Sequence, residues 1–403
     1  MTSRLALAAR RPARSLPITI RNQVLFTLVI GASLAVLVAG FVGYAPNRLV
    51  SGRPIALWAA ADPLSTAGIL ALGAILLTAC LMTPSRTLHY VVAVLAAALL
   101  LLALAAAGHA ASILTIGAKP ASRISLGAAF WTLIACAALA VVDALQRLAV
   151  GPAARVLAVA VIASGAVVLA TSGTFDALSI AREYDSRHQV FADALLRHVT
   201  LVAASVGAAV AIGFPLGVAV VRNPHLQGPV FAILNTLQTI PSIALFGLLI
   251  VPLSSLTAAA PQLEALGIAG IGVAPAIIAL VLYALLPVVR NTSAGLTGVD
   301  SAIVEAARGM GLTRRQIFWQ VELPLAFPVL LAGLRIVTVQ AIGLAVVAAL
   351  IGAGGLGTFV FEGLGQYAVD LVLLGTLPAI VLALAADFML QILAAVLPSR
   401  LAP

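Results

Sequence analysis

Long apolar runs alternate with short polar connections along almost the whole chain. A run of about 20 apolar residues is long enough to cross a bilayer as a helix, and ten runs approach or exceed that length. We expect membrane-spanning helices at 24–44, 64–83, 88–107, 125–142, 153–172, 199–221, 229–252, 271–289, 325–350 and 371–397. The pattern therefore predicts an all-α polytopic membrane protein with about ten transmembrane helices.

Two polar segments divide this pattern. Residues 175–198 carry a dense mixture of charges, and apolar residues keep helical spacing in the second part of the segment. We expect an external charged linker that ends as an amphipathic lead-in to the next span. It separates an N-terminal region of five spans, residues 1–174, from a second five-span region, residues 199–403.

The second polar segment, residues 300–324, is typical of two short helices joined by a bend. Asp300 or Ser301 can accept a hydrogen bond from the free amides that open the first helix. Gly309 and Gly311 then weaken helix continuity. We call this segment the elbow.

The second arm of the elbow begins directly after the bend. Thr313 and Gln316 have the spacing of a capping box, and we expect the helix to run to Leu323, where Pro324 interrupts it. In the first arm, helical spacing gives a shallow apolar face made of Ile303, Ala306, Ala307 and Met310. Such a face suits a groove in a partner protein, and it equally suits the lipid headgroup region.

Polar side chains also occur within a predicted span, beside a proline. They are Asn235, Gln238, Thr239, Pro241 and Ser242. Polar groups are costly against lipid, so these side chains should face another helix or a water-filled path. Hydrogen bonding between helices, without any path, explains them equally well.

Composition and charge agree with a membrane protein. The chain is 63% hydrophobic and 9% charged, which excludes a soluble globular domain of ordinary composition. A net charge of +9 would suggest nucleic acid for a soluble protein, but here the charges follow membrane topology. With the N-terminus placed inside, fourteen of the 22 lysine and arginine residues fall in cytoplasmic segments. Both termini and the elbow then face the cytoplasm, and no nucleic-acid partner is expected.

The sequence shows no enzymatic or metal chemistry. Cys80 and Cys136 are isolated within apolar runs and indicate neither a disulfide nor a metal site. His188 and His198 lack a third ligand nearby and are expected as solvated surface residues. The only lysine, Lys119, lies in no phosphate-binding loop. We therefore expect no catalytic residue, no metal ligand and no cofactor bound by this chain.

Two further segments imitate motifs of other proteins. Arg10, Arg11 and Arg14 precede an apolar run that is too long for a signal peptide, so we expect a retained first span. The glycines of Gly352–Gly357 lack the strand and helix context of a nucleotide-binding loop. We expect these glycines to let two copies of the chain, or the chain and a paralogue, approach each other closely at the outer gate.

The elbow carries a motif that resembles a known family. The matching residues are Glu305, Ala306, Ala307, Gly311, Val321, Leu323 and Pro324. They resemble the cytoplasmic loop of permeases from binding-protein-dependent ABC importers. Three further strings, 237–242, 282–292 and 351–357, resemble the glycine betaine, choline and osmoprotectant branch of these permeases. The likeness covers about residues 195–397, and the first five spans resemble only a longer subset of that branch.

The resemblance implies a division of labour among several proteins. The elbow would dock into an ATP-hydrolysing subunit through Glu305, Ala306, Ala307, Arg308, Gly309, Gly311, Leu323 and Pro324. Two such ABC ATPase subunits would bind ATP and Mg, an extracytoplasmic binding protein would capture the solute, and a second permease copy or paralogue would complete the path. The translocation path would be lined by Asn235, Gln238, Thr239, Pro241, Ser242 and Tyr283. The site of action would be the bacterial cytoplasmic (inner) membrane, with lipid around the spans.

The substrate remains open among small solutes. Aromatic faces hold quaternary ammonium groups best, but aromatic residues make up only 5% of the chain, so selectivity is expected mainly in the binding protein. An amino acid is the alternative solute. An ion-coupled secondary transporter is the alternative class, for which Asp387 is the one acid well inside a predicted span. Arg335, the basic residue within a span, is expected to extend its side chain to the inner interface, or to pair with Glu322 or with a carboxylate of a partner.

Overall fold

The computed structural model of the protein describes residues 20–48, 50, 52–265 and 267–396. Residues 1–19, with Arg10, Arg11 and Arg14, and residues 397–403 lie outside the described part. The chain divides into two compact units. The first unit holds residues 1–44, 52–120 and 126–175, and the second holds 45–51, 121–125 and 176–403.

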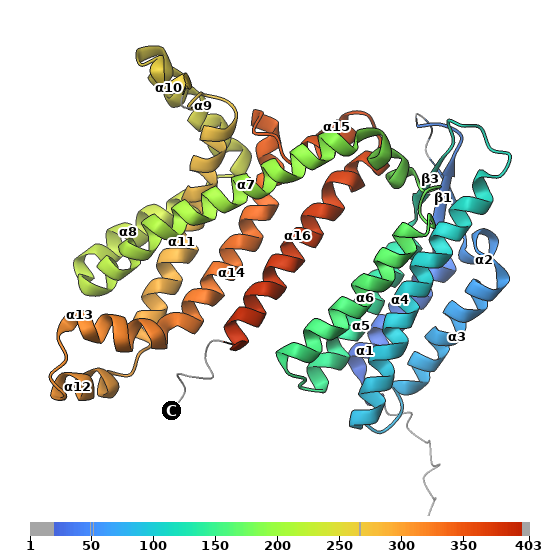
Figure 1. Ribbon diagram of the computed structural model, residues 1–403, viewed down its shortest axis with the longest axis horizontal. Helices are drawn as coiled ribbons and strands as arrows, with labels where there is room; N and C mark the ends of the chain where they lie inside the picture. The colour runs from blue at the N-terminus through green and yellow to red at the C-terminus, as the bar shows by residue number, and fades with distance from the viewer. Residues whose placement is uncertain (1–19, 49, 51, 266, 397–403) are drawn as a thin grey trace, which may run out of the picture. The chain divides into compact units, whose positions relative to one another are not determined.

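The first unit is a bundle of apolar helices (Figure 1). In chain order these are α1 (Gln23–Val38), α2 (Leu57–Ala60), α3 (Pro63–Ala79), α4 (Arg86–Thr115), α5 (Ala128–Arg147) and α6 (Pro152–Thr171). Helix α4 packs against α5, and α1 also packs against α5. Buried alanines such as Ala96, Ala103 and Ala106 line α4, and small side chains of this kind let membrane helices approach closely.

Three short strands lie in the connections between these helices. They are β1 (Val42–Ala45), β2 (Arg53–Ile55) and β3 (Arg123–Leu126), and their order in the sheet is β2-β1-β3. Strands β1 and β2 are antiparallel, with Val42 opposite Ile55. The prediction of an all-α membrane fold is confirmed, and the sheet is a small addition to it.

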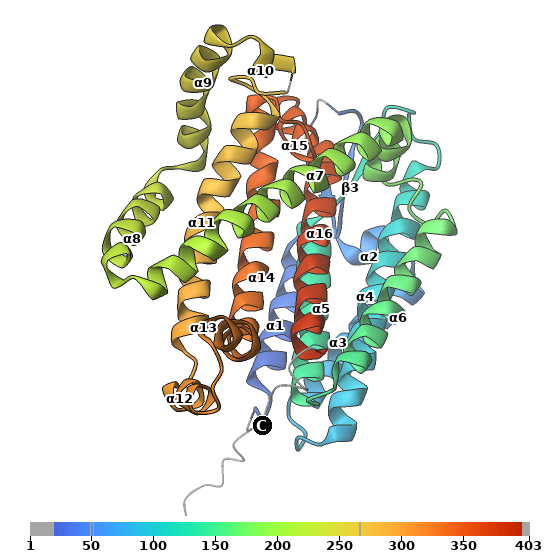
Figure 2. The ribbon, with the colours of Figure 1, turned by 60° about the vertical axis from the view of Figure 1, so that its left-hand side comes forward.

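The second unit contains the remaining helices. In chain order these are α7 (Ser179–Arg222), α8 (Pro224–Thr239), α9 (Ser242–Ala259), α10 (Gln262–Ala265), α11 (Val273–Thr297), α12 (Ser301–Gly309), α13 (Arg314–Ile317), a π-helical turn (Phe318–Glu322), α14 (Leu323–Val347), a 3₁₀ turn (Ala348–Ile351), α15 (Gly357–Gly365) and α16 (Val369–Val396). Figures 1 and 2 show α11 and α14 side by side, with α7 crossing them.

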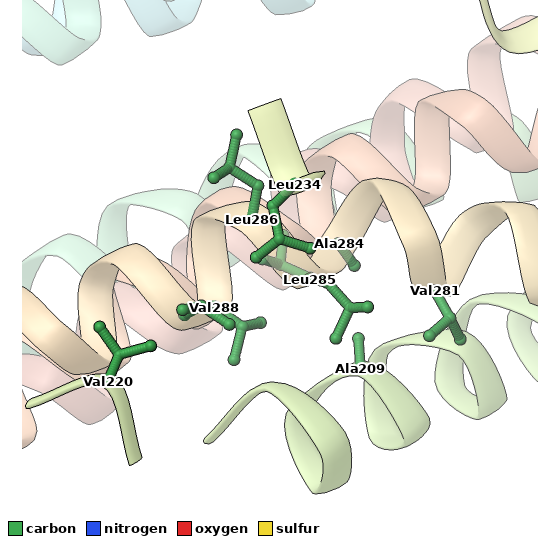
Figure 3. Packing of buried hydrophobic residues seen from close by; sticks show 10 residues of the cluster. Ala209, Val220, Leu234, Val281, Ala284, Leu285, Leu286 and Val288 are labelled. Carbon is green, nitrogen blue, oxygen red and sulfur yellow. The ribbon is translucent and has the colours of Figure 1, made fainter. Parts of the chain in front are cut away.

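Helix α11 forms the centre of the second unit because it packs against α7, α8, α9 and α14. Its apolar side chains belong to a buried cluster with residues of α7, α8 and α14. Figure 3 shows Ala209 of α7 pointing toward Leu285 of α11 within this cluster. Apolar helices of this kind need close packing between side chains, since lipid offers little hydrophobic drive for association.

Two glycines bring α7 against α11. A Cβ atom on Gly213 would lie 2.8 Å from Val288, and one on Gly217 would lie 2.6 Å from Thr292. Both distances are shorter than van der Waals contact, so the crossing requires glycine at these positions. Helix α7 remains helical through Pro215, and its one residue with non-helical backbone angles is Arg187.

Eight helices among the described residues are long and apolar enough to cross a membrane. They are α4, α5, α6, α7, α9, α11, the continuous helix Arg314–Ile351 and α16. Helices α1 and α3 are apolar but shorter, with 16 and 17 residues. The prediction of about ten spans is therefore met by eight full-length helices and two short ones.

The predicted span 229–252 is wrong as a single helix. It is divided between α8 and α9, and Ile240 between them has an extended backbone conformation with ψ 126°. Pro241 explains the break, because the residue before a proline is disfavoured in the helical region. An average of hydropathy over the run cannot detect this break.

Candidate functional site

The first arm of the elbow has the predicted cap and bend. The Asp300 carboxylate accepts a hydrogen bond of 2.9 Å from the amide of Ala302 at the start of α12. After α12, Gly311 takes a left-handed conformation with φ 82°, which glycine adopts without steric cost. The amide of Leu312 then donates to the carbonyl of Ala307 over 3.2 Å, which closes the end of the helix.

The second arm also begins as predicted but does not stop where expected. The capping box is confirmed: the amide of Gln316 donates to Thr313 Oγ1, and the amide of Thr313 donates to Gln316 Oε1 over 2.9 Å. The expected interruption at Pro324 is wrong, because the chain stays helical from 314 to 351. The π-helical turn Phe318–Glu322 leads directly into α14, and Pro324 lies in the first turn of that helix, where its missing N–H is tolerated.

The predicted coupling residues of the elbow differ in exposure. Glu305, Ala306, Arg308, Gly309 and Gly311 are exposed, Leu323 and Pro324 are half-buried, and Ala307 is buried. The expectation that Ala307 belongs to the exposed apolar face is therefore wrong. Ala307 lies at the edge of this face, about 100° around the helix from Ala306, and this edge points toward the rest of the chain.

Exposed apolar side chains nevertheless gather on the elbow. Ile303 is 44% exposed and Met310 is 73% exposed. Trp319, on the π-helical turn, is 56% exposed and was missed by sequence reasoning. Its position directly after a capping box, outside the apolar runs, could have indicated it. Large exposed apolar side chains on a polar segment are typical of a contact surface for another protein.

An ion pair ties the elbow to α7. Arg222, at the end of α7, forms two hydrogen bonds with the Glu322 carboxylate, of which the bond from Nη1 to Oε1 measures 3.3 Å. The Arg222 guanidinium also lies 5.7 Å from the centre of the Phe318 ring, within range of a cation–π interaction. The predicted pairing of Arg335 with Glu322 is wrong. These two residues are 13 positions apart along one helix, whereas Arg222 meets Glu322 from another helix.

Two of the predicted path residues, Gln238 and Tyr283, meet at the break between α8 and α9. Gln238 Nε2 donates to the carbonyl oxygen of Tyr283 over 2.5 Å, and the Tyr283 hydroxyl donates to the carbonyl oxygen of Ile240. Tyr283 is only 6% exposed. The second bond satisfies a carbonyl that the break leaves free, and the two bonds together fix the break to α11.

The other predicted path residues lie apart from this pair. Asn235 Oδ1 accepts from Arg290 over 3.1 Å, and the Thr239 hydroxyl donates within its own helix to Thr236. Asn235, Thr239 and Pro241 are exposed on the second unit, whereas Ser242 is half-buried. The contact with Arg290 was not predicted.

Charged residues within the spans neutralise each other. Arg335 on α14 forms a bidentate pair with Asp387 on α16, in which Nη2 lies 2.9 Å from Oδ2. Gln391 donates a further hydrogen bond of 3.0 Å to the same carboxylate. Asp387 is therefore engaged by an arginine and an amide, and an ion-coupled transporter loses its one candidate acid.

One further prediction, for a histidine on α7, needs correction. His198 is fully buried on α7, so the expectation of a solvated surface residue is wrong for His198, whereas His188 is exposed. The glycine loop packs against this region of the same chain. A Cβ atom on Gly355 would lie 3.2 Å from the His198 ring, and Arg197 Nε donates to the carbonyl of Ala353 over 3.2 Å.

Two family descriptions match the chain in separate regions. The description "ABC transporter permease YehY, N-terminal domain" matches residues 20–181. The description "binding-protein-dependent transport system inner membrane component" matches residues 209–400. The second match contains α12, α13, α14 and the broken α8–α9 segment.

Curated relatives match the same second region. The osmoprotectant import permease protein OsmW of Salmonella typhimurium is 43% identical over 208 residues, which are 51% of this chain and 90% of the relative. The carnitine transport permease protein OpuCB of Listeria monocytogenes is 40% identical over 194 residues, which are 48% of this chain and 82% of the relative. A crystal structure of the MetNI methionine ABC transporter in an inward-facing conformation is similar over 51% of this chain and 97% of its own, with 24% sequence identity and a TM-score of 0.42. The chain belongs to the family of binding-protein-dependent ABC transporter permeases, the inner-membrane components of ABC importers.

Proposed function

We propose that the chain is the membrane subunit of an ATP-driven importer for osmoprotectants such as glycine betaine. As a member of its family the chain is a transport subunit and not an enzyme, and ATP is handled by a separate subunit. The choice of solute rests on the relatives, whose names specify osmoprotectants, carnitine and choline. The first of them is 43% identical to this chain over 90% of its own length.

The elbow is the proposed site of coupling to the ATPase. The observation that carries this proposal is the exposure of three large apolar side chains, Ile303, Met310 and Trp319, on a segment that is itself tied to the membrane helices. The Arg222–Glu322 pair and the continuous helix 314–351 join the elbow to α7 and α14. Movement of a docked ATPase would therefore be passed to the transmembrane helices. The polar residues Glu305 and Arg308 lie exposed in the same arm and are available to the partner.

The translocation path is proposed to run along the exposed polar side of α8. Asn235, Thr239 and Pro241 are exposed in the isolated chain, although polar groups of a membrane protein are costly against lipid. A second permease copy, or a paralogue, would cover this side and enclose the path. Gln238, Ser242 and Tyr283 would then support the path from behind, by holding the break between α8 and α9.

The proposed assembly has two ATPase subunits with ATP and Mg, two permease subunits and an extracytoplasmic binding protein. Residues 199–403 form the proposed permease domain, with the coupling loop at 300–324. Residues 1–174 form the accessory region, and 175–198 the external linker. Both termini face the cytoplasm in this arrangement, which follows the distribution of arginines.

The test replaces Glu305 or Gly311 and measures ATP hydrolysis by the complex reconstituted in proteoliposomes. Glu305→Ala is expected to lower the stimulation of ATPase activity by the binding protein by about tenfold or more, as for loss of a central interface contact. Gly311→Val should have the same effect, since a β-branched residue is strained at φ 82°. Ser164→Ala, on exposed α6, is the control and should change nothing.

Unchanged stimulation in both elbow variants would overturn the coupling site. Uptake of labelled glycine betaine, choline, proline and methionine by the same vesicles tests the solute. Uptake of proline or methionine alone would replace the osmoprotectant by an amino acid. Uptake without ATPase subunits would exclude the ATP-driven mechanism.

A further inference from the structure

A cluster of buried charges lies at the end of the second unit opposite the elbow. Glu183, near the start of α7, is 4% exposed, and Asp370, at the start of α16, is 7% exposed. Figures 1 and 2 show the starts of α7 and α16 near α15, far from α12 and α13. Two buried carboxylates at one place are unfavourable unless positive charges accompany them.

The positive charges come from two loops that are distant in sequence. Arg48 follows β1 and Arg123 opens β3, and both loops, residues 45–51 and 121–125, belong to the second unit. The chain before and after each loop belongs to the first unit. The two loops are therefore segments of the N-terminal half of the sequence that belong to the second unit.

Each arginine lies close to both carboxylates. Arg48 donates a hydrogen bond to Glu183 Oε1, and its Nη2 lies 4.0 Å from Asp370 Oδ2. Arg123 Nη2 lies 3.7 Å from Glu183 Oε1, and Arg123 Nε lies 3.7 Å from Asp370 Oδ2. The two arginines thus bridge α7 and α16.

Without these arginines the rest of the cluster carries an excess of negative charge. Arg187 Nη1 lies 3.0 Å from Glu362 Oε2 on α15, and Arg187 Nε lies 3.7 Å from Glu183. One arginine then faces three carboxylates, those of Glu183, Glu362 and Asp370. Arg48 and Arg123 bring the six groups to zero net charge.

The backbone of α7 is kinked at this place. Arg187 interrupts the helical geometry of α7 with φ −134° and ψ 20°, so the segment before it, residues 179–186, is set at its own angle. That segment carries Glu183, and it also carries Arg182, whose Nη1 donates to the carbonyl of Ser122 over 3.3 Å. The second loop therefore contacts the segment through its backbone as well as through Arg123.

We propose that Arg48 and Arg123 form an electrostatic brace through which the two loops 45–51 and 121–125 hold the starts of α7 and α16 together. The brace binds Glu183 and Asp370. These two carboxylates stay buried only because the two loops supply their counter-charges. The two loops thereby fix the end of the second unit that lies opposite the proposed ATPase contact. The brace itself does not depend on the proposed solute, and its effect on transport rests on the proposed function.

The test compares charge-neutralised variants of the full-length protein. Arg48→Gln and Arg123→Gln should each lower the melting temperature of the purified protein by several degrees, because each leaves a buried carboxylate without its partner. Backbone amides of residues 179–187 should exchange hydrogen more than about tenfold faster, as expected for local opening. Arg53→Gln, on exposed β2, is the matched control and should change neither quantity.

A second set of variants separates charge from packing. Adding Glu183→Gln to Arg48→Gln, or Asp370→Asn to Arg123→Gln, should recover most of the loss, since the buried charge is removed together with its partner. Failure of these pairs to recover, or arginine variants that behave like Arg53→Gln, would overturn the brace. A wild-type protein that takes up no betaine would overturn the proposed solute and leave these stability results unaffected.

Discussion

Single polar atoms decide how the broken helix of the second unit is held. The Tyr283 hydroxyl reaches the carbonyl of Ile240, a group that the break before Pro241 leaves without a partner in its own helix. The side-chain amide of Gln238 donates a hydrogen bond to the carbonyl oxygen of Tyr283. A carbonyl without a partner is costly where water is excluded. These two side chains thus make a break in a membrane helix compatible with stability.

Removing the Tyr283 hydroxyl should expose this dependence. Tyr283→Phe keeps the ring in place and is expected to lower stability by about 1–2 kcal/mol, because the Ile240 carbonyl loses its donor. Thermal unfolding of the purified protein measures the change. Tyr184→Phe is the control, since Tyr184 is 44% exposed. Equal stability of the two variants would show that the Ile240 carbonyl needs no donor.

Helix crossings depend on where small residues lie. Gly213 and Gly217 let α7 pass directly over Val288 and Thr292 of α11, so one turn of α7 is adapted to one turn of its neighbour. Other glycines of the same helix have no such contact: a Cβ atom on Gly207 would meet nothing within 4 Å. Glycine therefore serves different purposes within a single helix.

Substitution by alanine should affect stability differently at Gly217 and at Gly207. Gly217→Ala is expected to destabilise the protein by about 1–3 kcal/mol, as an overpacked core does, because its Cβ would lie 2.6 Å from Thr292. Gly207→Ala should be neutral or stabilising by up to about 1 kcal/mol, since alanine is the better helix former. Thermal or denaturant unfolding measures both. A loss of stability in Gly207→Ala as large as that in Gly217→Ala would contradict this account.

The sequence predicted elements better than contacts between them. The capping box at Thr313 and the bend at Gly311 depend on neighbours within a few residues, and both were predicted. The partners of Glu322 and Glu183 lie 100 and 135 positions away in sequence. Such pairs arise only after helices have packed, so neither spacing nor hydropathy indicates them. The inward position of Ala307 was missed for the same reason.

At the scale of the whole molecule, the proposed second copy would cover the exposed polar side of α8. Thr239 is exposed, and so is Val381 on α16, which is 63% exposed but apolar. An apolar side chain can face lipid at no energetic cost, whereas a polar side chain is more stable against protein or water. The two positions should therefore differ in their distance from a partner permease.

Cysteine cross-linking tests this difference in the membrane. In a Cys80→Ala, Cys136→Ala background, Thr239→Cys is expected to form a covalent dimer under mild oxidation, because it lies at the proposed interface. Val381→Cys should remain monomeric, since it faces lipid. Gel electrophoresis without reductant measures the dimer. Dimers from Val381→Cys and none from Thr239→Cys would place the interface elsewhere.

One continuous helix, residues 314–351, which we call the rod, connects the elbow to the glycine turn at the other end of α14. It has 38 residues and therefore a length of roughly 57 Å. One end carries Trp319 on the elbow, and the other leads directly into the glycine turn beside His198. The π-helical turn at 318–322 places one additional residue in the winding, which offsets the two ends by roughly 100° of rotation. Deleting one residue there would restore regular α-helical winding and rotate the Trp319 end relative to the other end. A single additional residue thus sets the orientation of the elbow relative to the transmembrane part of this helix.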